Sequence, residues 1–291
     1  MLFKTIGLVG KFGDPSVNDT LARVGRYLIE RGHDVLLDEH SAEMWPDHGF
    51  PTAERQVLGS SSNLVVVVGG DGTLLNAARS VARYEVPVLG INLGRLGFLV
   101  DISPNDCLTR LNSILAGEYQ EENRILMRAS IYHDGERVSD SAAFNDVVVH
   151  KWEVARMIEL ETYIDGYFVS TIRADGLIVS TPTGSTAYAL SGGGPILHPT
   201  LNAMVLVPIC PHTMSNRPIV ISGDSEVEIV ISETHLSDAQ VTCDGQVNLG
   251  LASGDRVKVC KHDHIIRLIH PKHHDHYEIL RAKLHWGKKL S

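Results

Sequence analysis

Short apolar runs alternate with amphipathic stretches through the first part of the chain. Four runs predict strands: Ile6–Val9, Val35–Leu37, Leu64–Val68 and Val86–Asn92. Amphipathic stretches between and after them predict three helices: Val17–Arg31, Thr73–Arg83 and one opening at Ser103–Asp106. In the first helix the apolar positions recur every three or four residues, which is the spacing of one helix face. Strands that alternate with helices predict an open parallel sheet.

The apolar period falls to two beyond about Ile125. Glu226–Ile231 and Arg256–Val259 alternate in the way that half-buried strands do. Asp-Gly pairs recur at 134–135, 165–166 and 244–245, each between strand-forming residues. An Asp-Gly pair in that setting is a strong signal for a tight hairpin. This part of the chain is therefore predicted to form an antiparallel β-sandwich.

The change of period divides the 291 residues into two predicted domains. An open Rossmann-like α/β domain is expected over 1–124, and a β-sandwich domain over 125–270. The segment Tyr277–Leu284 has a helical pattern again. We therefore expect 271–291 to pack back on the first domain as a C-terminal helix.

Composition and charge narrow the possible partners. The net charge is −9 and no basic stripe is visible, so nucleic acid is not expected to bind. No apolar run approaches the ~18 residues that a membrane span needs, and Met1–Thr5 lacks a signal layout, so no membrane is expected as partner. The four cysteines are scattered, which suits a reducing cytoplasm: Cys107, Cys210, Cys243 and Cys260.

The turn Gly69-Gly70-Asp71-Gly72-Thr73 lies between a predicted strand and a predicted helix. Glycines let the backbone approach a phosphate closely, and a helix N-terminus presents unpaired amides with a partial positive charge. Asp71 is unusual there, because a carboxylate repels phosphate. It is accounted for if it accepts a proton from an attacking hydroxyl. The alternative is that Asp71 caps the following helix. The turn predicts a soluble phosphotransferase with Asp71 at its centre.

A second loop, Ser180–Pro195, combines hydroxyls, three consecutive glycines and one aromatic ring. Such a segment offers donors for ribose and phosphate oxygens, and Tyr188 offers a surface for a base. The alternative is an elaborate turn between two strands. The length of the loop favours a binding role.

Three shorter motifs carry charge or carboxamide groups: Asn145-Asp146, Arg173-Ala174-Asp175-Gly176 and Asp244-Gly245-Gln246. Each is either a site component or an ordinary turn or solvated pair. Phe98 and Arg95 follow a strand and are expected at the same sheet edge as the glycine turn, lining a cleft.

Six histidines gather near the C-terminus: His262, His264, His270, His273, His274 and His276. No metal-ligand spacing recurs among them, and no acidic motif accompanies them. We expect a solvated face and predict no metal site in the protein.

Taken together and in this order, these motifs resemble the NAD kinase family. The resemblance rests on the turn at 69–73 and on five further segments: Asn-Asp 145–146, Arg-Ala-Asp-Gly 173–176, Thr-Pro-Thr-Gly-Ser-Thr-Ala-Tyr 181–188, Pro-His-Thr with Arg-Pro 211–218 and Cys-Asp-Gly-Gln 243–246. It covers nearly the whole chain. It implies transfer of the ATP γ-phosphate to the 2′-hydroxyl of the adenosine ribose of NAD, giving NADP, with Mg²⁺ delivered with ATP.

The resemblance also implies a role for each matching residue. Asp71 is expected to be the general base, within a phosphate loop of Gly69, Gly70 and Thr73. The implied substrate-binding residues are Gly72, Leu75, Phe98, Asn145, Asp146, Arg156, Arg173, Asp175, Thr183, Thr186, Ala187, Tyr188, Ala189, Leu190, Ser191 and Gln246. Many members of the family have Glu where this chain has Asp146. Members are usually homo-oligomers, so a dimer or tetramer is expected, with a cleft between the two domains as the site.

Two other functions fit part of the pattern. A lipid or sugar kinase can share the glycine turn, as diacylglycerol-type kinases and phosphofructokinases do, but the threonine-rich loop with Tyr188 argues against it. A dinucleotide sensor without catalysis can share the loops. Asp71 argues against that, because a pure binder gains nothing from a charge that repels phosphate.

Overall fold

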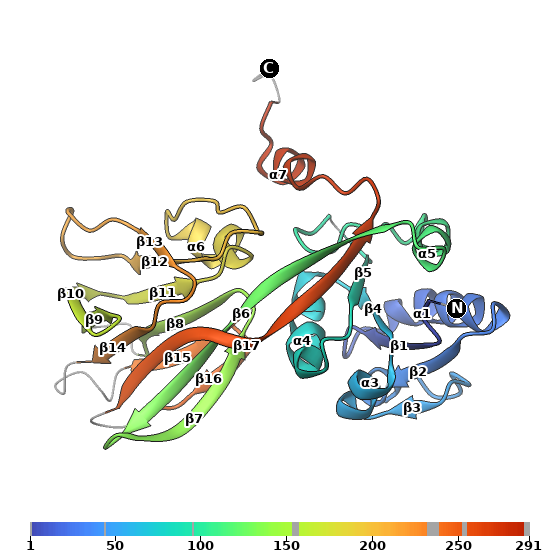
Figure 1. The fold of residues 1–291 in the computed structure, drawn as a ribbon, viewed down its shortest axis with the longest axis horizontal. Helices are drawn as coiled ribbons and strands as arrows, with labels where there is room; N and C mark the ends of the chain where they lie inside the picture. The colour runs from blue at the N-terminus through green and yellow to red at the C-terminus, as the bar shows by residue number, and fades with distance from the viewer. Residues whose placement is uncertain are drawn as a thin grey trace. The chain divides into compact units, whose positions relative to one another are not determined.

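The computed structural model describes residues 2–43, 45–94, 96–152, 157–231, 239–251 and 255–287. It divides into two compact units: unit 1 comprises Met1–Asn123 with Ile266–Ser291, and unit 2 comprises Arg124–Ile265. The division falls within two long strands, β6 (Tyr119–His133) and β17 (Arg256–Pro271). Each unit has its own core and is described by itself (Figure 1).

Unit 1 is built on a parallel sheet, as the alternating pattern predicts. Its strands are β1 (Thr5–Gly10), β2 (Asp34–Asp38), β3 (Thr52–Ala53), β4 (Leu64–Gly69) and β5 (Val88–Asn92). Their spatial order is β3-β2-β1-β4-β5, and the last residues of β17 continue the sheet beside β5, also in parallel. The strand order reverses between β1 and β4. In open α/β sheets such a reversal opens a crevice at the carboxyl ends of the two strands.

Helices cover both faces of this sheet (Figure 1). The helices of unit 1 are η1 (Pro15–Val17), α1 (Asn18–Glu30), α2 (Glu39–Ala42), α3 (Arg55–Ser61), α4 (Asp71–Val81), η2 (Ala82–Tyr84), α5 (Cys107–Leu115) and, after the end of β17, α7 (His276–Leu284). The apolar face of α1 packs with α5 on one side in a core that includes Leu8 and Val66. On the other side, α3 lies so close to β1 that a Cβ on Gly7 would meet Leu58 at 2.6 Å.

Unit 2 consists of two antiparallel sheets, as the period-two pattern predicts. One has the order β10-β9-β14-β17, and β6 and β7 continue it beside β17. Its strands, besides those given above, are β7 (Glu136–Ala143), β9 (Ile158–Ile164), β10 (Tyr167–Ala174) and β14 (Val227–Ile231). The other has the order β13-β12-β11-β8-β15-β16. Its strands are β8 (Asp146–Lys151), β11 (Gly176–Ser180), β12 (Ala203–Ile209), β13 (Ile219–Ser222), β15 (Ala239–Cys243) and β16 (Val247–Leu249).

One apolar core joins the two sheets of unit 2. Leu160 and Ile229 enter it from the first sheet, and Val149 and Val179 from the second. All three Asp-Gly pairs are hairpin turns in which both residues have positive φ, from 48° to 85°. That geometry is the reason for the pair, because Gly adopts it freely and Asp tolerates it. The predicted β-sandwich is confirmed.

Most of the predicted helices and strands are present, but some begin at other residues. The helix after the glycine turn begins at Asp71 rather than Thr73. The helix predicted to open at Ser103 begins at Cys107, because Ser103 closes a turn in which its hydroxyl and carbonyl oxygens accept from Asn105 N and Asp106 N. Helix α7 lies in unit 1, where the Lys283 ammonium lies 5.2 Å above the Phe98 ring. No described helix is long and apolar enough to cross a membrane.

Candidate functional site

A cavity of about 960 Å³ opens in unit 1 at the carboxyl ends of β1, β4 and β5. This is the point at which the strand order reverses, where α/β sheets bind ligands. Its lining comes from those strand ends and the loops after them, from β2, and from η1, α2, α3 and α4: Val9, Gly10, Lys11, Phe12, Asp14, Ser16, Asp38, His40, Arg55, Gly69, Gly70, Gly72, Thr73, Asn76, Ser80, Asn92, Leu93 and Gly94. The volume is at the upper end of what ligand pockets occupy.

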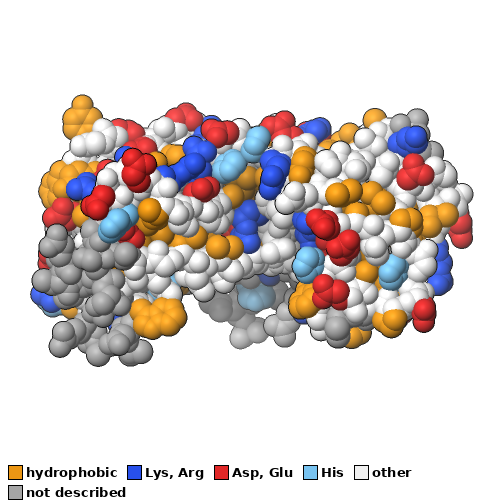
Figure 2. Space-filling model, turned by 90° about the horizontal axis from the view of Figure 1, so that it is seen from below, with side chains coloured by type: hydrophobic (Ala, Val, Ile, Leu, Met, Phe, Trp, Pro, Cys, Tyr) orange, Lys and Arg blue, Asp and Glu red, His pale blue; other side chains and the backbone are white. Residues whose placement is uncertain are grey.

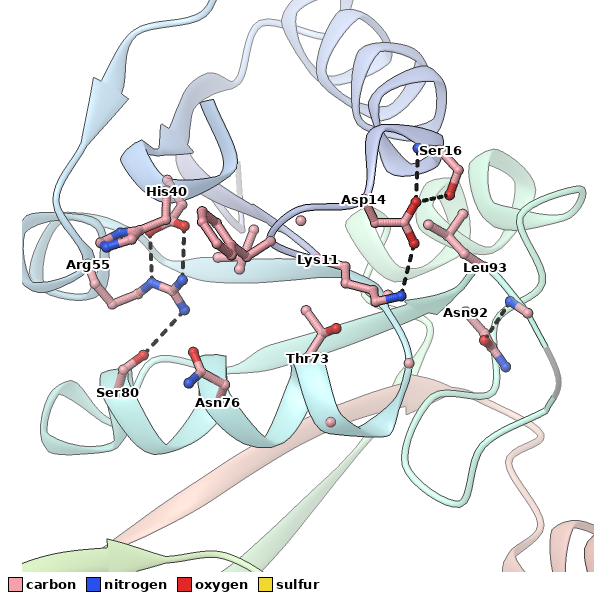
Figure 3. Close-up of a pocket in the computed structure, with 18 residues that line it drawn as sticks. Lys11, Asp14, Ser16, His40, Arg55, Thr73, Asn76, Ser80, Asn92 and Leu93 are labelled. Atoms are coloured by element: carbon pink, nitrogen blue, oxygen red, sulfur yellow. Dashed lines mark hydrogen bonds and ion pairs between the residues drawn. The ribbon is translucent and has the colours of Figure 1, made fainter. Parts of the chain in front are cut away.

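The glycine turn forms one wall of this cavity, and cationic groups face it. Thr73 and Asn76 rise from α4 toward the side on which Lys11 and Arg55 lie (Figure 3). The Lys11 ammonium lies 3.0 Å from the Asp14 carboxylate. The Arg55 guanidinium donates to both oxygens of buried Asp38, at 2.8 and 2.9 Å. Amides at the start of α4, glycines and two cations make this cavity suited to a polyphosphate.

Asp71 is held by a neighbouring loop. Its Oδ2 accepts a hydrogen bond from Phe98 N at 2.8 Å, and its Oδ1 accepts from Leu99 N at 3.1 Å and Val100 N at 3.2 Å. Helix α4 has Gly70 as its N-cap, without a side-chain cap bond. Asp71 itself stands in the first turn of α4, as the helix-cap alternative expects, while its carboxylate binds the amides of the loop 98–100. The three amides offset the negative charge that the sequence pattern left unexplained beside a phosphate loop.

Two glycines make room for this arrangement. A Cβ on Gly97 would lie 2.0 Å from Oδ1 of Asp71, so only glycine lets the loop approach the carboxylate. A Cβ on Gly69 would lie 2.5 Å from the Thr73 hydroxyl. Both are requirements for close approach, since neither glycine has a positive φ. The apolar neighbours implied by the family resemblance differ in exposure, because Leu75 is buried in the core and Phe98 is half-buried.

Unit 2 brings the predicted Asn145-Asp146 and Asp244-Gly245-Gln246 motifs together. The Asp244 carboxylate accepts hydrogen bonds from the backbone amides of Phe144, Asn145 and Asp146, the shortest being 2.7 Å from Asn145 N. In return, Asp244 N donates to the Asp146 carbonyl at 2.9 Å. Asp244 thus stands in a hairpin turn, as the turn alternative expects, and its side chain in addition anchors the start of β8. Gln246 follows on the same hairpin and is exposed.

The Asp146 side chain is buried close to the Asp244 carboxylate. Burial, and in second place the charge of Asp244, raise the pKa of Asp146 from 3.8 to about 7. A carboxyl group that titrates near neutral pH is unusual outside functional sites. It can donate a hydrogen bond when protonated and accept one when ionised.

The loop between β11 and β12 folds into two short helical turns, η3 (Gly184–Thr186) and α6 (Tyr188–Ser191). Several of its hydroxyls serve the fold. Thr181 Oγ1 donates to the Phe144 carbonyl at 2.7 Å, and Ser185 Oγ donates to the Pro182 carbonyl at 2.6 Å. The sequence pattern alone does not separate these internal donors from groups that face a ligand.

Among the predicted binding residues of this loop, exposure varies widely. Thr183 is buried and its hydroxyl accepts from Arg124 at 3.2 Å. Ala189 is fully buried, and Leu190 and Thr186 are half-buried. Tyr188 is 47 % exposed, so its ring surface is open to a ligand. Ala187, just before it, is half-buried, and Ser191, at the end of α6, is exposed.

The remaining predicted residues lie around β10. Asp175 follows that strand, and its carboxylate pairs with the Lys151 ammonium at 2.6 Å. Arg173 is exposed on the same strand, and its carbonyl accepts from His212 N at 2.8 Å. Arg156 and Arg95 lie outside the described residues.

The prediction of a solvated histidine face is wrong for two of its members. His270 is buried, and the His274 side chain is 3 % exposed. Both rings face Asp101, which lies about 170 residues earlier in the chain. Motif spacing cannot reveal an acidic partner at that separation.

On the face drawn in Figure 2, acidic and basic side chains are interspersed over the described residues.

Sequence reasoning also missed several residues that line the cavity of unit 1. Lys11 and Asp38 stand at or just after the ends of β1 and β2, and Asn76 stands one turn into α4. The sequence does contain one signal that points to Lys11 and Asp38 as cavity residues. Once the parallel sheet is predicted, polar residues at its strand ends are candidates for the same crevice.

Comparison with known proteins gives one consistent family. The model of the ATP-NAD kinase N-terminal domain matches residues 6–119, and that of the ATP-NAD kinase C-terminal domain matches residues 144–271. A NAD kinase of Nitrosococcus oceani is 53 % identical over 288 residues, covering 99 % of this chain and 98 % of the relative. A NAD kinase of Pseudomonas savastanoi pv. phaseolicola is 51 % identical over 288 residues, covering 99 % and 97 %.

Two solved structures share the fold. The crystal structure of yeast NADH kinase complexed with NADH has a TM-score of 0.89 at 25 % identity and covers 99 % of this chain and 89 % of that one. The crystal structure of an NAD kinase from Archaeoglobus fulgidus in complex with ATP has a TM-score of 0.76 at 26 % identity, with coverage of 97 % and 98 %. Two domain models and the full-length relatives indicate the same family, and the chain belongs to the ATP-NAD kinase family of phosphotransferases.

Proposed function

We propose that this chain transfers the γ-phosphate of ATP to the 2′-hydroxyl of the adenosine ribose of NAD, giving NADP, with Asp71 as the general base. The observation that carries the proposal is the position of the Asp71 carboxylate. Asp71 stands in the first turn of α4, beside a cavity suited to phosphate, and three backbone amides of the loop 98–100 hold its carboxylate. The family assignment supports ATP and NAD as the substrates, and the hydrogen bonds that hold the Asp71 carboxylate support its role as the base.

ATP occupies the unit 1 cavity in this proposal. Its triphosphate lies against Gly69, Gly70, Gly72 and Thr73, where the α4 amides and the helix dipole attract negative charge. The Lys11 ammonium, which pairs with Asp14, lies on the opposite side of the cavity. A phosphoryl transition state spreads its charge over three oxygens, so most of the rate enhancement comes from such positioning and neutralisation.

Magnesium enters with ATP. Oxygen atoms of Asp14, Thr73 and Asn76 lie at the cavity wall, and hard oxygen ligands are those that hydrated Mg²⁺ accepts. The ion would neutralise charge on the phosphates. The chain's own contribution is to orient the donor, with the glycine turn as the backbone cradle.

Asp71 accepts the proton of the substrate hydroxyl. Its Oδ2 takes one hydrogen bond from the loop, whereas Oδ1 takes two, so Oδ2 keeps room for a hydroxyl donor. The three amides fix the carboxylate in one rotamer. Fixed orientation is what a general base contributes in a reaction that needs little activation of the nucleophile.

NAD is held by polar groups of unit 2 in this proposal. Asn145 and Asp146 hold ribose hydroxyls, Asp175 and Arg173 the nicotinamide side, and the exposed Tyr188 ring lies against the dinucleotide. The anchoring of β8 by Asp244 supports this, because it fixes the direction in which Asn145 and Asp146 point. The pKa of Asp146 near 7 supports a polar role for this buried carboxyl.

The variant Asp71→Asn tests the proposal. We expect turnover of NAD to NADP to fall by ~10²-fold or more, because a positioned base contributes at least that much. Binding of ATP and of NAD, measured by calorimetry, should stay close to that of the parent. Asp19→Asn is the matched control, because Asp19 also stands in the first turn of a helix but far along the chain from the glycine turn.

A coupled NADP assay with ATP and either NAD or NADH gives the readout. Turnover of Asp71→Asn near that of the parent would remove Asp71 from the reaction. NAD binding without any ATP-dependent product would instead favour a dinucleotide sensor. ATP consumption only with a lipid or a sugar would favour the other kinase classes.

We further propose a cytoplasmic homo-oligomer, a dimer or tetramer. None of the four cysteines, all of which the structure describes, is part of a disulfide, which suits a reducing compartment. On β10, an edge strand of its sheet, Tyr167, Phe168 and Val169 are 79 %, 59 % and 41 % exposed. An apolar group on an outer strand is typical of an interface. Light scattering of the purified protein tests this, and a monomer at assay concentration would contradict it.

A further inference from the structure

Three segments that are far apart in the sequence converge near the end of β17 in unit 1 (Figure 1). Asp101 lies in the segment after β5, and the next residue, Ile102, forms a parallel bridge with Ile91. His270 is the penultimate residue of β17, and His274 lies in the turn before α7. The tertiary structure thus brings one carboxylate and two imidazoles to a single point.

The donor atoms of these three residues are close enough to share one cation. One ligand atom from each lies within 4.8 Å of those of the other two. Nδ1 of His274 lies 2.6 Å and Nδ1 of His270 3.5 Å from Oδ2 of Asp101. Two ligands about 2.1 Å from a tetrahedral zinc lie about 3.4 Å apart. The distances of 2.6 and 3.5 Å lie on either side of that value, so small side-chain rotations would bring the three donor atoms to the spacing of zinc ligands.

The histidine rings are buried and short of partners. Their centroids are 3.8 Å apart and the planes differ by 23°. Only 2 % of the His270 side chain is exposed. Among the described residues, neither ring nitrogen of His270, nor Nε2 of His274, has a hydrogen-bond partner. A buried polar group without a partner is costly, and a coordinated metal ion would satisfy it.

We propose that Asp101, His270 and His274 form a binding site for a first-row divalent transition cation, with zinc as its occupant. Two imidazoles and one carboxylate are donors that Zn²⁺ accepts, whereas Mg²⁺ prefers oxygen alone. A fourth position remains for water or another donor from the adjoining cavity of about 290 Å³, lined by Asp101 and His274.

A second carboxylate stands behind one of the ligands. Oε2 of Glu122 lies 3.9 Å from Nε2 of His270, on the ring nitrogen that does not face Asp101. Histidines that bind metals usually direct their other nitrogen at a carboxylate or carbonyl, which fixes the tautomer and the ring orientation. At 3.9 Å Glu122 forms no hydrogen bond with His270, so it places a negative charge near this ligand without fixing the ring.

The site has a structural consequence for the segment that holds Asp71. Asp101 directly follows Phe98, Leu99 and Val100, whose amides bind the Asp71 carboxylate. A cation on Asp101 ties that segment to β17 and to the turn before α7. A link to turnover rests on the proposed function, whereas cation binding does not, so the two can fail separately.

Metal binding to the tag-free full-length chain tests the site. After dialysis against a chelator, the protein is titrated with zinc by calorimetry, and bound zinc is counted by elemental analysis. We expect one zinc per chain. Removing an outer partner of a metal site costs 10–100-fold in affinity, so losing a direct ligand in Asp101→Asn or His274→Gln should cost at least ~100-fold.

A matched control is available on the same strand. His262 and His264 form another close imidazole pair on β17, with centroids 5.4 Å apart. The variant His262→Gln should bind zinc like the parent. Because Cys210 carries an exposed thiol, the stoichiometry is also measured in Cys210→Ser and should be unchanged.

The cobalt complex of the unmodified protein gives a readout that does not depend on how a variant folds. Co²⁺ in a tetrahedral nitrogen and oxygen site has visible d–d bands without a thiolate charge-transfer band. Such a spectrum at one Co²⁺ per chain supports the site. A thiolate band, no saturable binding at micromolar zinc, or affinities of Asp101→Asn and His274→Gln within about threefold of the parent would overturn it.

Discussion

The buried carboxyl group of Asp146 makes a quantitative prediction about stability and pH. Its pKa is raised from 3.8 to about 7 by burial, with a smaller contribution from the Asp244 charge. The folded state therefore holds the proton more tightly than the unfolded state does. The resulting stabilisation is fully present below about pH 4 and is lost as the pH rises through 7.

The size of the effect follows from the two pKa values. One pKa unit corresponds to about 1.4 kcal/mol, so the rise from 3.8 to about 7 is a change of about 4 kcal/mol in the free energy of unfolding. Between about pH 5 and about pH 8 the same linkage relation gives about 2.5 kcal/mol. Asp146 is only 5 % exposed, so solvent screening does little to reduce this figure.

The variant Asp146→Asn isolates this contribution, because asparagine has nearly the same shape and does not titrate. We expect the melting temperature of the variant, relative to the parent, to rise by roughly 5–10 °C from about pH 5 to about pH 8. Differential scanning calorimetry across this range measures it. The comparison cancels the titration of all other groups. Asp134→Asn, at a hairpin turn where the side chain is 92 % exposed, is the control for replacing an aspartate.

Parallel stability curves for the parent and Asp146→Asn would refute the reasoning. That result would mean that Asp146 titrates alike in the folded and unfolded protein. A carboxyl carbon shift of Asp146 followed by NMR would then show a midpoint near 4. A midpoint near 7 together with diverging melting temperatures would support both the burial and the coupling to Asp244.

Three other substitutions test separate parts of the structure. Gly184→Ala would place a Cβ 2.2 Å from the carbonyl oxygen of Asn145, so we expect about 1–3 kcal/mol of destabilisation by thermal melting and a raised KM for NAD. Arg55→Ala leaves the buried Asp38 carboxylate without its bidentate partner, and we expect urea unfolding to show a loss of about 3–5 kcal/mol. Tyr188→Ala removes an exposed ring proposed to lie against NAD, and steady-state kinetics should show a KM for NAD raised roughly tenfold at little-changed kcat.

The local pattern of the sequence predicts most of the fold. Leu64–Val68 is buried on both faces as its β-branched run predicts, and the three Asp-Gly pairs are turns with positive φ. Strand and hairpin signals of this kind depend on residues a few positions apart. Helix starts were less well predicted, because the turn at Ser103 satisfies its backbone groups without continuing into a helix.

For the candidate site, the sequence shows the motifs but not the residues with which they interact. The glycine turn and the threonine-rich loop could be recognised in the sequence, and the cavity of unit 1 contains most of that turn. The partners of these residues could not. Nothing near Asp71 in the sequence indicates that its carboxylate binds the amides of 98–100, and nothing near Thr181 shows that its hydroxyl is used by Phe144.

The sequence by itself therefore determined the two-part fold, the family and the segments that carry the chemistry. Only the tertiary structure decided the raised pKa of Asp146, the anchoring of β8 by Asp244, and the meeting of Asp101 with His270 and His274. The physical reason is one of distance along the chain. Secondary structure follows from neighbours within a turn or two, whereas burial, charge coupling and shared ligands arise between segments that folding brings together.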